Sequence, residues 1–97
     1  MRIIARKTLK KFWVAHPEAE NALRAWFHEA KTAKWKSFLD IKTRYPTADV
    51  RPRNRAIFDI RGNSFRLVVK IHYNVGIIFI RFVGTHKQYD RIDPDTV

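Results

Sequence analysis

The first third of the chain carries apolar residues at the spacing of α-helices. One stripe predicts an amphipathic helix over residues 6–15 and consists of Leu9, Phe12, Trp13 and His16. Pro17 ends this helix and suits the first turn of the next one. The second stripe predicts a helix reaching about residue 33 and consists of Ala19, Ala22, Leu23, Trp26, Phe27 and Ala30. The two helices are expected to form a hairpin across the tight proline turn.

Shorter elements are predicted on both sides of this hairpin. The pair Ile3-Ile4 indicates a short N-terminal strand. Ser37 and Asp40 have the spacing of a helix-capping box, with Asp in place of the usual Glu or Gln, and begin a short third helix. Pro46 is expected to stop that helix. Residues 47–54 contain few apolar side chains, so we expect a loop there.

From Arg55 onward the apolar period changes to two, which is the period of a β-strand. The alternation predicts three strands, joined by turns at Gly62-Asn63 and residues 74–76, over residues 55–61, 65–73 and 77–83. The last of these strands is almost wholly apolar, which is typical of a strand covered on both faces.

The order of the predicted elements is β-α-α-β-β-β, with the short third helix inserted before the later strands. This order predicts an α+β fold, in which the N-terminal helical hairpin packs on one face of a twisted antiparallel sheet. The chain has 97 residues and no repeat or linker, so we expect a single domain over residues 1–97.

Composition narrows the class of protein. Apolar residues make up 45% of the chain, which is enough for one core and argues against disorder. The lack of cysteine excludes disulfides, Cys-based metal sites and thiol nucleophiles. No signal-peptide-like or membrane-spanning apolar run is present, so we expect a soluble cytoplasmic protein with no membrane partner. The histidines show no metal-ligand spacing and no phosphate-binding glycine loop exists, so we expect neither a metal nor another cofactor.

The charge points to a polyanionic partner. Twenty Lys and Arg face nine Asp and Glu, a net charge of +11, which suggests nucleic acid, a ribosome or an acidic protein. On the strand over residues 65–73, the side chains of Arg66, Lys70 and His72 project from one face. An RNA-binding surface is therefore predicted from Arg51, Arg53, Arg55, Arg61, Lys70 and His72. The alternative is a solvated outer face whose charges aid solubility.

The stretch GTHKQYDRID over residues 84–93 contains both the signals of a helix start and side chains that are candidates for catalysis. Thr85 and Gln88 fit a capping box, and Gly84 permits a sharp exit from the strand. Capping leaves four neighbouring residues without an explanation, namely His86, Lys87, Tyr89 and Asp90. If the turn is helical, His86 occupies its first position and shares a face with Tyr89 and Asp90.

These residues suggest a hypothesis of metal-free RNA cleavage. In such a reaction the 2′-hydroxyl of the RNA attacks the adjacent phosphate, a base removes the hydroxyl proton, and an acid protonates the leaving 5′-oxygen. A neutral His86, oriented by Asp90 and favoured by the helix start, suits the base. Lys87 and the sheet cations would hold the developing charge.

Two segments together resemble the HigB-type toxins of bacterial toxin–antitoxin modules, which belong to the wider RelE-like group of mRNA interferases. Residues 54–67 carry the pattern Gly-Asn-x-[Phe/Tyr]-Arg-[Leu/Ile], and residues 80–90 carry the ending Thr-His-x-x-Tyr-Asp. The resemblance covers most of the chain and agrees with its length and element order. It implies a RelE-like fold and cleavage of mRNA in the ribosomal A site. It also implies inhibition by a helix-turn-helix, HigA-like antitoxin, through which alone operator DNA would be reached.

The resemblance also implies roles for individual residues. Arg66 matches the family's sheet arginine, which contacts the scissile phosphate, and Lys87 would stabilise charge with it. His86 is expected to act as acid or base, and Tyr89 as its partner or as a stacker on the target base. Asp90 would orient His86 or cap the helix. Members of the group vary here, and many use Lys, Arg and Tyr with no His, so the resemblance does not assign the general base.

Three alternatives remain open from the sequence. The chain is a catalytic toxin, a non-catalytic basic module that binds RNA or DNA as a regulator, or a degraded toxin that serves only its antitoxin complex. The cationic helix face of Lys7, Lys10 and Lys11 similarly fits ribosomal RNA, an acidic antitoxin, or plain solvation.

Overall fold

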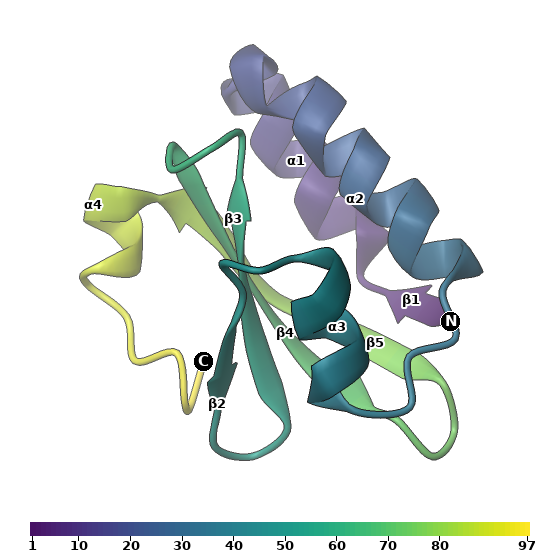
Figure 1. The fold of residues 1–97 in the computed structure, drawn as a ribbon. Helices are drawn as coiled ribbons and strands as arrows, with labels where there is room; N and C mark the ends of the chain where they lie inside the picture. Colours follow the sequence, from purple (N-terminus) through teal and green to yellow (C-terminus); the bar gives the residue numbers. More distant parts are fainter.

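A five-stranded mixed β-sheet lies at the centre of the computed structural model, which describes all of residues 1–97 (Figure 1). The spatial order of the strands is β1-β5-β4-β3-β2. Every neighbouring pair is antiparallel except β1 and β5, which run parallel. The strands are β1 (Arg2–Ile4), β2 (Asp49–Arg51), β3 (Arg55–Ile60), β4 (Phe65–His72) and β5 (Ile77–Thr85).

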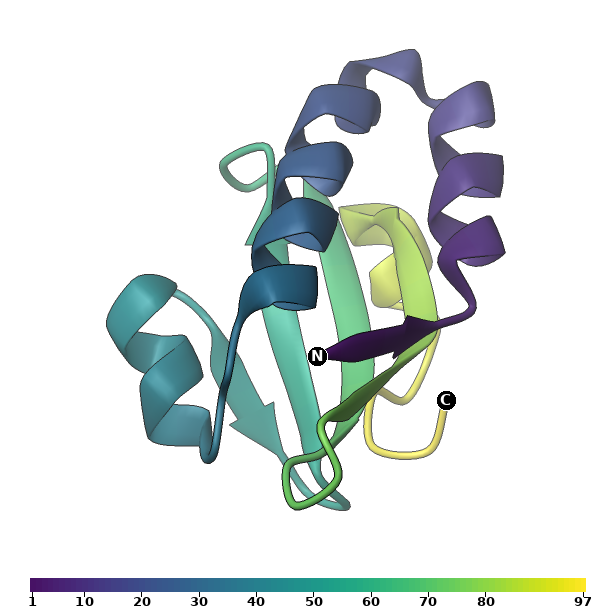
Figure 2. The same ribbon diagram turned by 90° about the vertical axis from the view of Figure 1, so that its right-hand side faces the viewer.

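The helices are divided between the two faces of the sheet. An N-terminal hairpin covers one face, and a single C-terminal turn of helix lies against the other (Figures 1 and 2). A 3₁₀ turn over Pro17–Ala19 joins the two helices of the hairpin. The α-helices are α1 (Arg6–Ala15), α2 (Glu20–Thr32), α3 (Phe38–Arg44) and α4 (His86–Tyr89). None of them has the length and apolar character that crossing a membrane requires.

The apolar stripes of the hairpin meet the sheet as the helical period predicts. The buried residues of α1 are Leu9, Phe12 and Trp13, and those of α2 are Leu23, Trp26 and Ala30. Val14, on the opposite side of α1, is 72% exposed. The predicted helical hairpin and its core-facing residues are confirmed.

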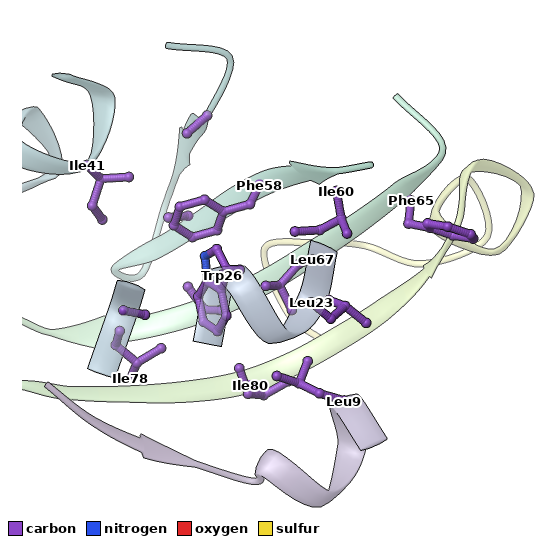
Figure 3. Close-up of a cluster of buried hydrophobic side chains, with 14 of the residues drawn as sticks. Leu9, Leu23, Trp26, Ile41, Phe58, Ile60, Phe65, Leu67, Ile78 and Ile80 are labelled. Atoms are coloured by element: carbon purple, nitrogen blue, oxygen red, sulfur yellow. The ribbon is translucent and has the colours of Figure 1, made fainter. Parts of the chain in front are cut away.

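Aromatic rings fill the core between α2, α3 and the sheet. The ring of Phe58 on β3 lies 5.4 Å from that of Trp26, 6.1 Å from that of Trp35 and 5.1 Å from that of Tyr45, measured between centroids. Figure 3 shows Trp26 beside Phe58 within the cluster of buried side chains. Trp35, which lies between two lysines in the sequence, is therefore a core residue and not an exposed stacking platform.

Two strand predictions were wrong. Residues 47–54 are not all loop, because Asp49–Arg51 forms β2 and pairs with Arg55–Ile57 of β3. This strand is exposed along its whole length, so it shows no apolar alternation that a sequence pattern could detect. The sheet is mixed and not purely antiparallel, because three residues of β1 pair in parallel with β5 at its outer edge. A three-residue apolar segment carries no information about its direction.

The predicted capping box at Ser37 is also wrong in its bonds. The hydroxyl of Ser37 makes no capping hydrogen bond, although the residue does occupy the N-cap of α3. The carboxylate of Asp40 instead accepts a hydrogen bond of 2.8 Å from the backbone N–H of Lys36, one residue earlier than predicted. The short helix itself, ended before Pro46, is confirmed.

A β-bulge in β5 determines which of its side chains face the core. Val68 pairs with Phe82 while Val69 pairs with Ile80, so Arg81 is an extra residue without a cross-strand partner. The extra residue reverses the alternation beyond it. Ile80 and Val83 therefore both pack with the main core, and Phe82 turns to the opposite face.

We predict that Phe58→Ala lowers the free energy of unfolding by about 3–5 kcal/mol, since it removes the ring on which three other aromatic residues pack. Leu39→Ala is the matched control, because Leu39 is 72% exposed and its loss should change stability by no more than about 0.5 kcal/mol. Urea denaturation followed by far-UV circular dichroism measures both. Equal losses in the two variants would contradict this description of the core.

Candidate active site

The sheet face opposite the hairpin carries a small apolar layer with charged residues around it. Ile57 and Val68, which are cross-strand partners, are 3% and 0% exposed but do not belong to the main core cluster. On the same face of β4, Arg66 lies between Asp59 of β3 and Gly84 of β5. The site is built on this face, close to where β4 begins and β5 ends.

Arg66 is held from two directions. Its Nη1 forms an ion pair with Asp59, and the two side chains are only 22% and 16% exposed. Its guanidinium carbon also lies 5.5 Å from the ring centroid of Tyr89. The Nε atom is buried and has no hydrogen-bond partner. The ion pair and the ring contact thus fix the guanidinium in place on this face of the sheet.

Tyr89 reaches this guanidinium from α4. Its ring lies 6.4 Å from that of Phe82, the residue that the bulge turns to this face. Burial raises the pKa of the Tyr89 phenol above its usual value, although the positive charges of Arg66 and Arg51 oppose the rise. The phenol therefore remains protonated at neutral pH and has a proton to donate.

His86 is oriented by a residue that sequence reasoning used only as a turn former. Its Nε2 lies 3.1 Å from Oδ1 of Asn63, in the turn between β3 and β4. With that oxygen as acceptor, Nε2 carries the hydrogen and Nδ1 is the free basic atom. Asp90 was expected to orient this ring or to cap the helix. Its carboxylate is exposed and makes no bond to the ring, but the residue is the C-cap of α4 and its backbone N–H bonds to the carbonyl oxygen of His86. The only sequence signal for Asn63 was its place in the Gly-Asn turn motif.

The capping box at the start of α4 is confirmed. The hydroxyl of Thr85 accepts from the backbone N–H of Gln88 at 3.2 Å, and the Gln88 side chain accepts from the backbone N–H of Thr85 at 2.8 Å. Gly84 allows the close return of the chain. A Cβ atom at position 84 would lie 2.5 Å from Cζ of Phe82 and 2.8 Å from Oε1 of Gln88. A side chain at position 84 would therefore force Phe82 and Gln88 to move.

The end of the chain binds several of the cations that were predicted to bind RNA. Arg51 makes two hydrogen bonds to the carboxylate of Asp95, of 2.7 and 2.9 Å, which lower the pKa of that carboxyl. Arg55 is 6% exposed and donates to the backbone oxygen of Val97 at 2.7 Å, which also accepts from Arg81 at 3.1 Å. Arg53 lies 3.5 Å from the backbone oxygen of Asp95.

The other predicted cations are placed differently. Lys70 and Lys87 make no hydrogen bond or ion pair, so both ammonium groups are free. His72 packs its ring 5.4 Å from that of Phe79. Arg61 lies in the turn after β3 and lines a pocket with Glu29 and Arg44, apart from the row on β4. The structure thus brings Arg66, Tyr89 and the Asn63–His86 pair to one end of the sheet.

Residues 19–92 match the model of a protein family described as HigB_toxin, RelE-like toxic component of a toxin–antitoxin system. The chain belongs to this HigB toxin family. A toxin of such a module has an antitoxin as its partner. The matched residues include the whole candidate site, from Asn63 and Arg66 to Tyr89.

Named relatives of this HigB-family chain cover nearly its full length. It is 27% identical over 92 residues to the mRNA interferase toxin HigB of Escherichia coli strain K12, an alignment that covers 93% of this chain and 88% of the relative. The proteins called mRNA interferase HigB in Escherichia coli O157:H7 and Shigella flexneri show the same identity and coverage.

We predict that Gly84→Ala displaces α4 and lowers the free energy of unfolding by about 1–3 kcal/mol, because its methyl group overlaps Phe82 and Gln88. Hydrogen exchange should show faster exchange of the α4 amides than the global change in stability explains. Gly76→Ala is the control, since its φ of +67° makes alanine costly while no atom lies within 4 Å. Similar α4 exchange in both variants would refute the proposed contact.

Proposed function

We propose that this chain is a ribosome-dependent endoribonuclease that cleaves mRNA in the ribosomal A site and thereby inhibits translation. The observation that carries the proposal is the contact of the Arg66 guanidinium with the Tyr89 ring, next to a histidine oriented by Asn63. A module that only binds nucleic acid has no use for a titratable imidazole and a protonated phenol at the end of its cationic strand. The family membership and the names of the relatives support the same activity.

In the proposed reaction the RNA supplies its own nucleophile. The 2′-oxygen attacks the adjacent phosphorus as Nδ1 of His86 removes the hydroxyl proton. The bond from phosphorus to the 5′-oxygen breaks, and the phenol of Tyr89 donates a proton to that oxygen. The products are a 2′,3′-cyclic phosphate and a 5′-hydroxyl. The positive charges of Arg66 and Lys87 neutralise the charge that develops on the phosphoryl oxygens.

Two residues support the reacting groups without touching the RNA. Asp59 fixes the guanidinium of Arg66 through their ion pair. Asn63 fixes the plane and tautomer of His86 from the turn between β3 and β4. These are positioning residues, and both act from β3 and the turn that follows it. Asp90, without a side-chain partner, has no such role in this arrangement.

The RNA is proposed to follow β4 away from the reacting groups. Arg66, Lys70 and His72 project from one face of this strand, where alternate side chains are about 7 Å apart. Lys70 is free to contact a phosphate, whereas Arg51, Arg53 and Arg55 contact RNA only after the C-terminal residues leave them. Action at the ribosome places the protein in the cytoplasm.

The partner that restrains this activity is proposed to be a helix-turn-helix antitoxin of the HigA type. A toxin–antitoxin family requires an antitoxin, and a surplus of eleven positive charges suits an acidic partner. Operator DNA would be contacted through that antitoxin. The toxin itself is proposed to read RNA.

We predict that Tyr89→Phe and His86→Gln each lower the rate of mRNA cleavage in a translating extract by about 10²–10⁴-fold, since each removes a proton-transfer group. Their affinity for ribosomes should stay close to that of the wild type. Tyr73→Phe is the matched control, because it deletes a second half-buried phenol whose pKa burial also raises, at the far end of β4. Unchanged cleavage in both site variants would favour a non-catalytic binding module.

We also predict that the paired and free cations differ in their effect on RNA binding. Lys70→Ala should reduce the slope of log affinity against log salt by about one unit and leave stability unchanged within about 0.5 kcal/mol. Arg55→Ala should change the slope less but lower the free energy of unfolding by about 1–3 kcal/mol, because its bond to Val97 is lost. Filter binding over a salt series and urea denaturation distinguish these outcomes, and equal slope changes would refute the distinction.

A further inference from the structure

A groove between α1 and α2 has the composition of an anion site. It encloses about 330 Å³ and is lined by Arg6, Trp13, Arg24, Phe27, His28 and Lys31. Three of these side chains are permanent cations and one is a histidine, while none is a carboxylate. The groove belongs to the helical hairpin, which lies on the opposite side of the sheet from α4 (Figures 1 and 2).

Both arginines of the groove are held in place by aromatic rings of the other helix. Arg6 of α1 places its guanidinium carbon 4.8 Å from the ring centroid of Phe27 on α2. Arg24 of α2 lies in the same way 4.7 Å from the ring of Trp13 on α1. Stacking on a ring orients the guanidinium plane and leaves its N–H edge available for a planar oxyanion. The groove therefore presents two oriented donor groups on aromatic surfaces.

The positive charge within the groove is largely uncompensated. Glu20 is the one carboxylate that pairs with a lining residue. It accepts a hydrogen bond of 2.7 Å from Nε of Arg24. The Nη groups of Arg24 make no hydrogen bond, and Arg6 and Lys31 have no acidic partner. Like charges that share a groove repel, so an anion bound between them gains from all of them.

We propose that this groove binds a glutamate- or aspartate-rich segment of a protein partner, the antitoxin being the partner that the family requires. A side-chain carboxylate on a peptide reaches into a recess whose floor includes Trp13, a residue only 5% exposed. A phosphodiester is flanked by riboses on both sides and suits a flatter surface. Charge complementarity with a chain of net charge +11 supports the same occupant. The proposal does not depend on RNA cleavage, because none of the lining residues belongs to the candidate active site.

The test is two-dimensional ¹H–¹⁵N NMR titration of the full chain with a short glutamate-rich peptide. We expect shifts of the Trp13 indole and of the Arg6 and Arg24 Nε–H signals, with the other two tryptophans unchanged. The double variant Arg6→Lys with Arg24→Lys keeps the charge but loses the paired N–H donors of the two guanidinium groups. It should weaken peptide binding about tenfold. Lys34→Gln with Lys36→Gln, two exposed lysines outside the groove, removes two charges and should weaken binding much less.

Each other outcome decides against the proposal. Equal weakening in the two double variants, or shifts confined to other surfaces, would show that the peptide is attracted by the overall positive charge and does not bind in the groove. A single-stranded RNA oligonucleotide that shifts the groove signals more strongly than the peptide would assign the groove to RNA. If the double arginine variant fails to fold, Lys31→Gln, which disturbs no ring stack, should lower peptide affinity several-fold, and unchanged affinity there would overturn the proposal. Tyr89→Phe should bind the peptide normally even if cleavage is lost.

Discussion

The one-residue shift in pairing between β4 and β5 determines the chemistry that the sheet can support. Without the extra residue at Arg81, Phe82 would point into the main core, and Gly84 would not lie beside Arg66 on the outer face. With it, Phe82 supports the ring of Tyr89, and Gly84 leaves room for the cap of α4. Before the bulge, alternate side chains of β5 pack into the main core. After the bulge, the same alternation places Phe82 and Gly84 on the outer face, beside the polar side chains of the candidate site.

The two faces of the sheet differ in what they bury. The hairpin face buries nineteen apolar residues in one cluster and stabilises the fold. The opposite face buries only a few, among them Ile57 and Val68, and uses the remaining area for charged side chains and α4. Because the candidate active site lies on one side and the cationic groove on the other, the proposed cleavage and the proposed partner binding use separate sets of residues.

Much of this arrangement followed from local patterns in the sequence. The helix over residues 6–15, the strands from Arg55 and the capping box at Thr85 were all predicted, because each shows in residues close together in the chain. Features that depend on distant residues were missed. The pairing of Asn63 with His86 spans 23 positions, β2 is exposed and has no apolar period, and no local pattern marks the bulge. Asp90 was assigned to His86 because of sequence proximity, but the backbone brings Asn63 closer.

The C-terminal residues give the cationic face an internal competitor. Asp95 and Val97 bind Arg51 and Arg55, two of the residues proposed to contact RNA, and they belong to the same chain. Any anion arriving from solution has to displace a ligand whose effective concentration is very high, whereas an anion held in place by a larger assembly competes on more equal terms. For the proposed RNA substrate, this tether would favour RNA that is already presented at a fixed position over RNA that diffuses freely.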